Sequence, residues 1–256
     1  MEFGVCILVV ARGSDYLLVD ISNSYAKFAF ATTSRVLAPV RIATGKVSRS
    51  VVAGLLGKRK VQKVVVSSVV PTKNSAISKA AGGVSVLWLN WKLELGIGID
   101  YPKPQSIGAD RLANAAAVTA LYGFPAIVVD FGTAVTFDIV SGRRTYIGGV
   151  IAPGLEAMTS FLYQRTALLP ELSLREPRRA IGKSTIQAML SGAVFGYRGL
   201  VREILARIKA EQFPRKKVCI VATGGYAQLI AGRLPEIDAV CPHLTLEGLR
   251  IAANLN

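Results

Sequence analysis

Two aspartates in the 256-residue sequence stand where a ligand-binding carboxylate is expected. Asp20 and Asp130 each end a run of apolar residues, and each is followed by a turn of small residues, at 22–24 and 132–134. Parallel α/β sheets place ligand-binding groups at the carboxyl ends of strands, and the N–H groups of such turns can cradle phosphate oxygens. Either aspartate alone is explained more simply as a turn-capping residue, but the two together favour a clamp for a metal-bound nucleotide.

A third aspartate, Asp110, lies next to Arg111 at the expected start of a long helix. The helix dipole and the neighbouring guanidinium would both keep its carboxylate ionised. An ionised carboxylate in that place could accept the proton of a hydroxyl group. The position also suits an aspartate that only complements the helix dipole, so the pattern leaves both interpretations open.

Several catalytic classes lose support from the sequence. Residues 182–185 read Gly-Lys-Ser-Thr, the end of a Walker A loop, but that motif needs a glycine at position 177, where this chain has proline. No Gly-x-Gly-x-x-Gly pattern follows an apolar strand, so a dinucleotide-binding fold is not expected. His243 is the only histidine, which argues against a catalytic triad or a His-ligated zinc site and predicts a loop residue.

Short stretches rich in Val and Ile alternate with stretches of helical periodicity, which predicts an α/β fold with a largely parallel core. Strands are expected at residues 16–20, 61–67, 84–87, 126–130, 135–140 and 218–222, and helices at 47–56, 75–81, 107–122, 155–163, 185–209, 226–233 and 246–255. The segments 19–30 and 129–140 follow one plan: an apolar strand ending in Asp, a small-residue turn and a second strand. This internal echo predicts two similar halves with a cleft between them.

The charge is strongly positive and unevenly distributed. Lys and Arg total 31 against 16 Asp and Glu, which gives a formal charge of +15, and residues 21–93 hold twelve Lys or Arg and no acidic residue. Such a count suits a partner rich in phosphate, but the basic side chains are dispersed and no nucleic-acid-binding motif accompanies them. A nucleic-acid partner is therefore not favoured.

Composition and the distribution of apolar residues predict a folded protein without a membrane span or an export signal. With 51% hydrophobic residues the chain is expected to fold. The longest uncharged run, residues 112–129, contains an Asn and a Gly-Phe-Pro breaker, so it predicts a helix, a turn and a strand rather than a membrane span. The apolar residues 3–11 lack a preceding basic segment and predict no export signal. Three widely spaced cysteines form no disulfide framework, and we expect a cytoplasmic protein.

Six ordered blocks of the chain resemble the type III pantothenate kinase family. They read GADRLANAAAVTALYGFPAIVVDFGTAVTFDIV (108–140), YIGGVIAPGL (146–155), TALLPEL (166–172), IGKSTIQAMLSGAVFGY (181–197), ATGGYA (222–227) and LTLEGLR (244–250). This family belongs to the acetate and sugar kinase/Hsp70/actin superfamily, so the resemblance implies an actin-like ATPase fold of two ribonuclease-H-like domains with a cleft between them. The expected domains are residues 16–105 and 106–256, and residues 1–15 precede the usual start of the family.

The resemblance also implies an activity, the ATP-dependent phosphorylation of pantothenate to 4′-phosphopantothenate, which is the first step of coenzyme A biosynthesis. Asp110 would be the general base that takes the proton from the pantothenate hydroxyl. Pantothenate would be held by Tyr101, Gly108, Ala109, Asp110, Arg111 and Thr185. ATP would contact the first turn, Asp20, Ile21, Ser22, Asn23, Ser24, Tyr25, Ala26 and Lys27, together with Thr133.

Ions and a second subunit follow from the same resemblance. Asp20 would bind magnesium through water, and Asp130 would bind the potassium or ammonium ion that these kinases need. The family usually forms dimers that complete the pantothenate pocket. A homodimer is therefore expected, with pantothenate and ATP as its small-molecule partners.

One block departs from the family pattern, because the usual Asp-x-Gly-Asn-Ser/Thr turn has Ser22 in place of its glycine. If that glycine supplied a positive φ or a close approach to phosphate, Ser22 would weaken ATP binding. Together with the charge of +15, this leaves an alternative open: a catalytically impaired member that acts as a regulatory or nucleic-acid-binding protein. Retention of Asp20, Asp110, Asp130 and Thr185 argues against it.

Overall fold

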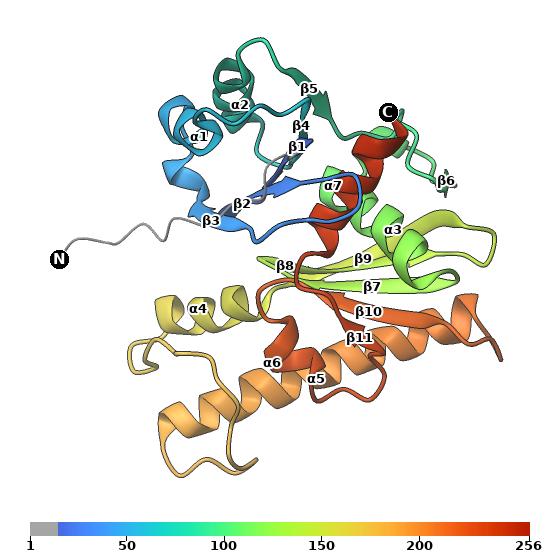
Figure 1. The fold of residues 1–256 in the computed structure, drawn as a ribbon. Helices are drawn as coiled ribbons and strands as arrows, with labels where there is room; N and C mark the ends of the chain where they lie inside the picture. The colour runs from blue at the N-terminus through green and yellow to red at the C-terminus, as the bar shows by residue number, and fades with distance from the viewer. Residues whose placement is uncertain (1–14) are drawn as a thin grey trace.

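Two β-sheets lie one above the other, with helices α3 (Ala109–Tyr122) and α7 (Leu244–Leu255) between them (Figure 1). The structure is a computed structural model and describes residues 15–256. The expectations for residues 3–11 and for the chain before the family start therefore lie outside the described residues.

The first sheet has five strands in the order β3-β2-β1-β4-β5. They are β1 (Tyr16–Ile21), β2 (Tyr25–Ala31), β3 (Val40–Ala43), β4 (Lys63–Ser68) and β5 (Ser85–Trp88). Strand β1 is antiparallel to β2 and parallel to β4, and all six of its residues are buried, as expected for an apolar strand covered on both faces. Helices α1 (Arg49–Leu56) and α2 (Asn74–Ala81) cover one face, where Val52 and Ile77 join its core.

The second sheet repeats this plan with one strand more, in the order β11-β10-β7-β8-β9-β6. Its strands are β6 (Gly98–Ile99), β7 (Ala126–Phe131), β8 (Ala134–Val140), β9 (Thr145–Pro153), β10 (Cys219–Thr223) and β11 (Ala239–Val240). Strand β7 is antiparallel to β8 and parallel to β10, as β1 is to β2 and β4. Helices α4 (Leu155–Arg165), α5 (Thr185–Gln212) and α6 (Ala227–Ala231) contribute to the core on its outer face. The repeated topology confirms the α/β fold of two similar halves.

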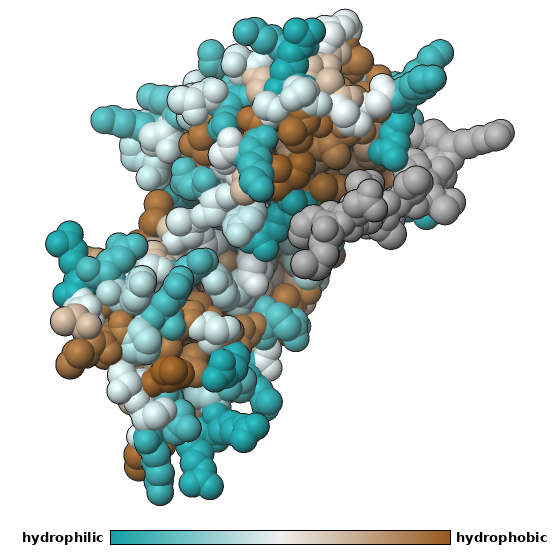
Figure 2. All heavy atoms as spheres, turned by 90° about the vertical axis from the view of Figure 1, so that its left-hand side faces the viewer, coloured by the Kyte–Doolittle hydropathy of each residue, from teal (hydrophilic) through white to brown (hydrophobic). Residues whose placement is uncertain are grey.

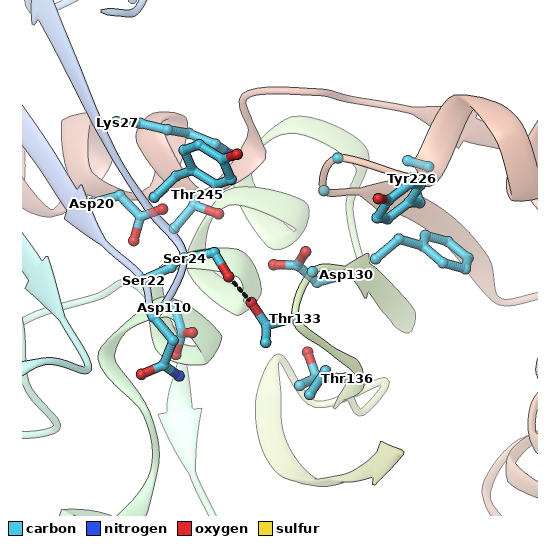
Figure 3. A pocket seen from close by; sticks show the side chains of 18 of the residues that line it. Asp20, Ser22, Ser24, Lys27, Asp110, Asp130, Thr133, Thr136, Tyr226 and Thr245 are labelled. Carbon is cyan, nitrogen blue, oxygen red and sulfur yellow. Dashed lines mark hydrogen bonds between the residues drawn. The ribbon is translucent and has the colours of Figure 1, made fainter. Parts of the chain in front are cut away.

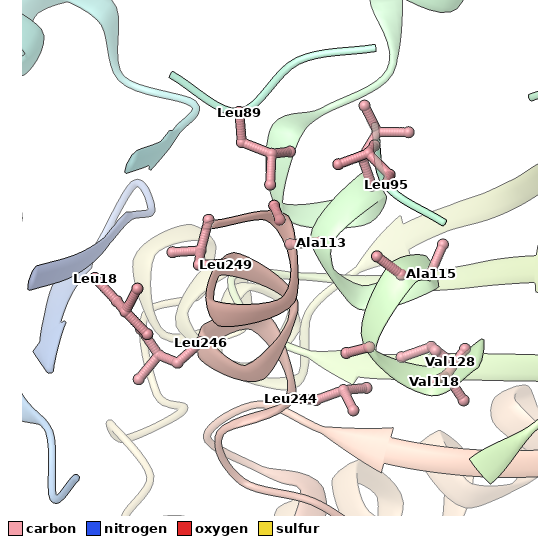
Figure 4. Close-up of a cluster of buried hydrophobic side chains, with 14 of the residues drawn as sticks. Leu18, Leu89, Leu95, Ala113, Ala115, Val118, Val128, Leu244, Leu246 and Leu249 are labelled. Carbon is pink, nitrogen blue, oxygen red and sulfur yellow. The ribbon is translucent and has the colours of Figure 1, made fainter. Parts of the chain in front are cut away.

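An apolar core around α3 and α7 joins the two halves. Leu246 and Leu249 of α7 are fully buried, and Figure 4 shows them between Leu18 of β1 and the α3 side of the core. Because burying one leucine stabilises a fold by about 1.5–3 kcal/mol, the last helix of the chain contributes strongly to holding the halves together. At Gly248 the carbonyl oxygen of Ala113 occupies the place of a side chain, so only glycine allows α7 to lie this close to α3.

Four strands were not expected from the sequence pattern, namely β3, β6, β9 and β11. Strands β6 and β11 have only two residues each, too few to show a periodicity. Strand β9 contains Gly148 and Gly149, which weaken the strand signal. Three short 3₁₀ turns, η1 (Thr44–Lys46), η2 (Pro71–Lys73) and η3 (Pro104–Ser106), complete the described elements.

Two elements pack on the half of the molecule to which the expected domain boundary does not assign them. Strand β6 precedes residue 105 but pairs with β9 of the second sheet, while α7 packs on β1 and β4 of the first. The boundary at 105/106 stays a prediction. The uncharged run at 112–129 forms most of α3, a turn and part of β7, as expected, and within residues 15–256 no helix is long and apolar enough to cross a membrane.

Candidate active site

A cavity of about 660 Å³ opens between the two halves, where β1 and β7 end. Its walls include the β1–β2 turn, the β7–β8 turn, the start of α6 and the turn before α7. The expected site residues that line it are Asp20, Ser22, Asn23, Ser24, Tyr25, Lys27, Asp110, Asp130 and Thr133. Figure 3 shows the carboxylates of Asp20, Asp110 and Asp130 arranged around this one space.

The two turns that follow the strand-end aspartates meet across the cavity. Ser22 and Gly132 each donate their backbone N–H to a carbonyl oxygen within the same turn, at 3.1 Å in both cases. The hydroxyl oxygens of Ser24 and Thr133 lie 2.9 Å apart (Figure 3). Hydroxyl groups from both halves therefore face the same space, where they could donate hydrogen bonds to an anion.

Ser22, the residue that departs from the family pattern, has an ordinary backbone conformation. Among the described residues, the non-glycine positions with positive φ are Arg144 at 60° and Arg215 at 63°. The first reason to expect weaker ATP binding was a positive φ at residue 22, and this expectation is therefore wrong. The second reason, a close approach to phosphate, stays a prediction.

Asp20 is a buried carboxylate with an unsatisfied oxygen. It is 4% exposed, and its Oδ1 has no hydrogen-bond partner among residues 15–256. Burial raises its pKa to about 7; Lys27, its neighbour across the β1–β2 ladder, lowers this pKa, whereas Asp110 and Asp130 raise it. A bound cation would stabilise the charged form of this carboxylate, and its oxygen donors suit a hard divalent ion.

Asp130 is held by one polar side chain, which is itself held by a second, and neither was singled out in the sequence as a site residue. Asn114 of α3 donates its Nδ2 to Oδ2 of Asp130 at 3.2 Å, and Thr245 of α7 donates its hydroxyl to Oδ1 of Asn114 at 2.9 Å. Burial raises the pKa of Asp130, while Lys27 and the hydrogen bond from Asn114 lower it. The only signal for Asn114 was a polar residue inside an apolar helical stretch.

Asp110 lies in the first turn of α3, whose N-cap is Gly108. Its Oδ1 accepts the backbone N–H of Arg111 at 2.9 Å. Burial is the main influence and raises the pKa of Asp110; the backbone N–H and the guanidinium of Arg111 lower it. A carboxylate with a raised pKa that lines a cavity beside two hydroxyl-bearing turns is suited to act as a general base.

Neither Arg111 nor Tyr101 lines the cavity between the two halves. The guanidinium of Arg111 turns toward β8, where its Nε lies 2.6 Å from Oδ1 of Asp138. The ring centre of Tyr101 lies 6.2 Å from that of Tyr146 on β9. The two expected pantothenate contacts therefore meet a common group of buried residues beside the cavity.

Four other residues that were expected to contact a ligand could do so only through their main chain. Ile21 and Ala26 are fully buried in the core of the first half. Gly108 and Ala109 lie at the start of α3, so their backbone N–H groups belong to the end of the helix that carries Asp110. These four residues could contact a ligand through the main chain.

Thr185 is exposed at the first position of α5 and lies outside the cavity lining. The preceding Ser184 caps this helix by accepting the N–H of Gln187 at 3.3 Å. The backbone of Ala188 fills the place of a side chain at Gly182. The Gly-Lys-Ser-Thr sequence therefore builds a helix start, in line with the rejection of a Walker A loop.

The structure adds cavity residues that had not been singled out as site residues. Gly224 has a φ of 95°, and a Cβ there would lie 2.5 Å from Oδ1 of Asp130, so the position requires glycine. The hydroxyl of Tyr226 donates to Oε2 of Glu156 at 2.9 Å, on the same wall. His243 lies in the turn before α7, as expected for a loop residue, and also lines the cavity.

Two ribonuclease-H-like halves around a carboxylate-lined cleft define a protein of the actin-like ATPase and sugar kinase fold. A proposed 2-dehydro-3-deoxygalactonokinase from Sinorhizobium meliloti shares this fold with a TM-score of 0.60 at 15% identity, over 93% of this chain and 96% of its own.

The sequence matches the type III pantothenate kinase family over residues 16–207. Type III pantothenate kinase from Akkermansia muciniphila is 49% identical over 251 residues, which cover 94% of this chain and 99% of the relative. The protein of the same name from Methylacidiphilum infernorum is 41% identical over 239 residues, covering 93% and 88%. The chain therefore belongs to the type III pantothenate kinase family and is an enzyme, an ATP-using phosphotransferase.

Proposed function

We propose that this protein transfers the γ-phosphoryl group of ATP to the primary hydroxyl of pantothenate, forming 4′-phosphopantothenate in the first step of coenzyme A biosynthesis. The observation that carries the proposal is the position of Asp110, a partly buried carboxylate that faces the same cavity as the hydroxyl-bearing turns of both halves. The cavity volume lies within the range of small-molecule sites. Family membership supports the identity of the acceptor.

The proposed role of Asp110 is to take the proton of the acceptor hydroxyl as its oxygen attacks the γ-phosphorus. An oxygen–phosphorus bond forms to the acceptor, the bond from the γ-phosphorus to the bridging oxygen breaks, and ADP leaves. In such transfers the protein mainly aligns the two substrates and neutralises charge. The raised pKa of Asp110 makes it a stronger base than an ordinary carboxylate.

We place the ATP phosphates between the two turns, in contact with residues 20–27 and Thr133. Lys27 and the hydroxyls of Ser24 and Thr133 supply donors there. Asp20 fits a magnesium ion held through water, because its buried Oδ1 lacks a partner among the described residues. No cluster of three metal-binding side chains occurs within residues 15–256, which suits an ion held largely by water and phosphates. Magnesium would neutralise charge on the phosphates.

We assign the potassium or ammonium site to Asp130. Its side chain is half-buried, Asn114 fixes one carboxylate oxygen at 3.2 Å, and Gly224 leaves room beside the other. A monovalent cation there would stabilise a carboxylate whose pKa burial raises.

A homodimer would complete the pantothenate side of the site, which also includes Tyr101, Gly108, Ala109 and Arg111. Thr185 lies outside the cavity of its own chain, so we propose that the partner's Thr185 reaches it. Large apolar side chains are exposed on α4, in the segment that follows it and around the start of α5, namely Met158, Phe161, Leu162, Leu168, Ile181 and Ile186. Figure 2 shows apolar side chains on both lobes of the face at the left of Figure 1, those of the lower lobe mixed with polar ones; exposed apolar patches are usual at interfaces between subunits.

We place the reaction in the cytoplasm, because Cys219 and Cys241 are free thiols, as is usual in a reducing compartment. The impaired, regulatory or nucleic-acid-binding alternative is not favoured. Its main support was Ser22, whose backbone carries no left-handed strain.

The test is formation of product by the purified protein. The enzyme is incubated with ATP, magnesium, potassium and pantothenate, and 4′-phosphopantothenate is measured by mass spectrometry alongside ADP. We expect ADP and phosphopantothenate in equal amounts, and ADP formation that depends on pantothenate. ADP formed at the same rate without pantothenate, or no turnover at all, would overturn the proposal.

A further inference from the structure

The guanidinium of Arg111 is fixed against β8 and β9. Its Nε donates to Oδ1 of Asp138 at 2.6 Å, a charge-assisted hydrogen bond between side chains that are 12% and 0% exposed. Its Nη2 approaches the carbonyl oxygen of Phe137 at 3.5 Å. Nη1 has no hydrogen-bond acceptor in the described part of the chain. One edge of the guanidinium is therefore occupied, and the Nη1 side remains available.

Asp138 is fully buried and does not line the cavity. Tyr146 donates its hydroxyl to the same Oδ1 at 3.3 Å, and Thr136 donates to Oδ2 at 3.5 Å. Burial raises the pKa of Asp138 to about 7, and Arg111 lowers it. A buried charge without a partner is costly, so Asp138 and Arg111 stabilise each other in their ionised forms.

Gly149 provides the space in which the guanidinium lies. It stands opposite Asp138 in the β8–β9 ladder. A Cβ at this position would collide with Nη2 of Arg111 and with the carbonyl oxygen of Phe137. The glycine that weakened the strand signal in the sequence is thus needed for the placement of Arg111.

The same buried group reaches Tyr101. The ring centre of Tyr146 lies 5.8 Å from the guanidinium carbon of Arg111 and 6.2 Å from the ring centre of Tyr101. Arg111 and Tyr101 are both assigned to pantothenate under the proposed function. Their orientations therefore depend on a shared support.

We propose that Asp138 is a positioning residue that, with Gly149 and Tyr146, orients Arg111 toward the acceptor substrate. The inference rests on the proposed function. A guanidinium held through Nε and Nη2 keeps its Nη1 N–H groups for an anionic group of the substrate, and fixing it beforehand lowers the entropy lost on binding. Loss of Asp138 should therefore weaken acceptor binding and leave phosphoryl transfer largely intact, because Asp110 is unchanged.

The test compares steady-state kinetics of Asp138→Asn with the parent enzyme. We expect the KM for pantothenate to rise about 10- to 100-fold, the loss expected when a hydrogen bond to a charged group is removed, with kcat and the KM for ATP little changed. In an Arg111→Ala background, Asp138→Asn should raise the KM for pantothenate no further, because its effect passes through Arg111. Equal losses in both backgrounds, or an unchanged KM in the folded variant, would overturn the inference.

A milder variant keeps the test decisive if Asp138→Asn does not fold. Tyr146→Phe removes one hydroxyl donor to Asp138 and should raise the KM for pantothenate by a smaller factor. Tyr197→Phe is the matched control, because it removes a buried hydroxyl that donates to the carbonyl of Pro153 at 3.2 Å; its kinetics should equal the parent's. Equal KM values for the two tyrosine variants would contradict the inference. Parent enzyme without pantothenate-dependent turnover would instead contradict the proposed function.

Discussion

Replacing Asp20 by asparagine is expected to change how the stability of the protein depends on pH. The buried carboxyl of Asp20 has a pKa of about 7, compared with an ordinary value of 3.8. Between these values the folded protein holds a proton that the unfolded chain has lost. The free energy of unfolding contributed by this group therefore falls as the pH rises from about 4 to 7, and its full cost is present above that window.

The size of the effect follows from the difference between the two pKa values. A tenfold change in an acid dissociation constant corresponds to about 1.4 kcal/mol, so a rise in pKa from 3.8 to about 7 corresponds to about 4 kcal/mol, of which about 3 kcal/mol develops between pH 4.5 and 7.5. Asparagine cannot ionise. The stability of Asp20→Asn relative to the parent should therefore rise by about 3 kcal/mol across that range.

The assay is urea unfolding followed by circular dichroism at constant ionic strength, without nucleotide, at several pH values from 4.5 to 7.5. The comparison with the parent removes the contribution of all the other charged residues, which both proteins share. Glu211→Gln, a change at an exposed residue of α5, is the control and should follow the parent at every pH. A difference between Asp20→Asn and the parent that is the same at all pH values would refute the reasoning.

Three further predictions concern the cation, the nucleotide and the subunit interface. Asn114→Ala removes the amide donor 3.2 Å from Asp130, so more potassium should be needed for half-maximal activity in initial-rate assays with potassium, ammonium or sodium; an unchanged requirement would contradict the assignment of Asp130. Ser22→Gly should leave the KM for ATP within about twofold of the parent, because the backbone is unstrained; a KM lowered tenfold or more would contradict this. Phe161→Glu places a charge on an exposed apolar face. Light scattering should show a monomer, and the activity assay should show little turnover; an active monomer would exclude a shared site.

The internal echo predicted two similar halves with a cleft between them and the positions of the two strand-end carboxylates. Asp20 and Asp130 end equivalent strands of the two halves, so a fold with two similar sheets brings them to one cleft. Asp110 could be placed from its position at a helix start, and it lines the same cavity. Sequence periodicity is strong for these elements because their strands and helices are covered by apolar layers.

The supporting residues could not be predicted, because their partners are distant in the chain. Thr245 meets Asn114 across 131 residues, and Arg111 meets Asp138 across 27. A buried polar residue in an apolar run shows that a partner exists but does not identify it. Gly149 lies in a strand that the sequence pattern did not predict, and the close approach of Arg111 requires this glycine.

The most direct test of the account is the turnover of Asp110→Asn with ATP and saturating pantothenate. The amide preserves the shape of the side chain but cannot accept the hydroxyl proton. The predicted result is a fall in kcat of about 10²–10⁴-fold, with pantothenate binding by calorimetry close to that of the parent. A kcat within a few-fold of the parent's would show that Asp110 only complements the dipole of α3 and would contradict its role as the general base.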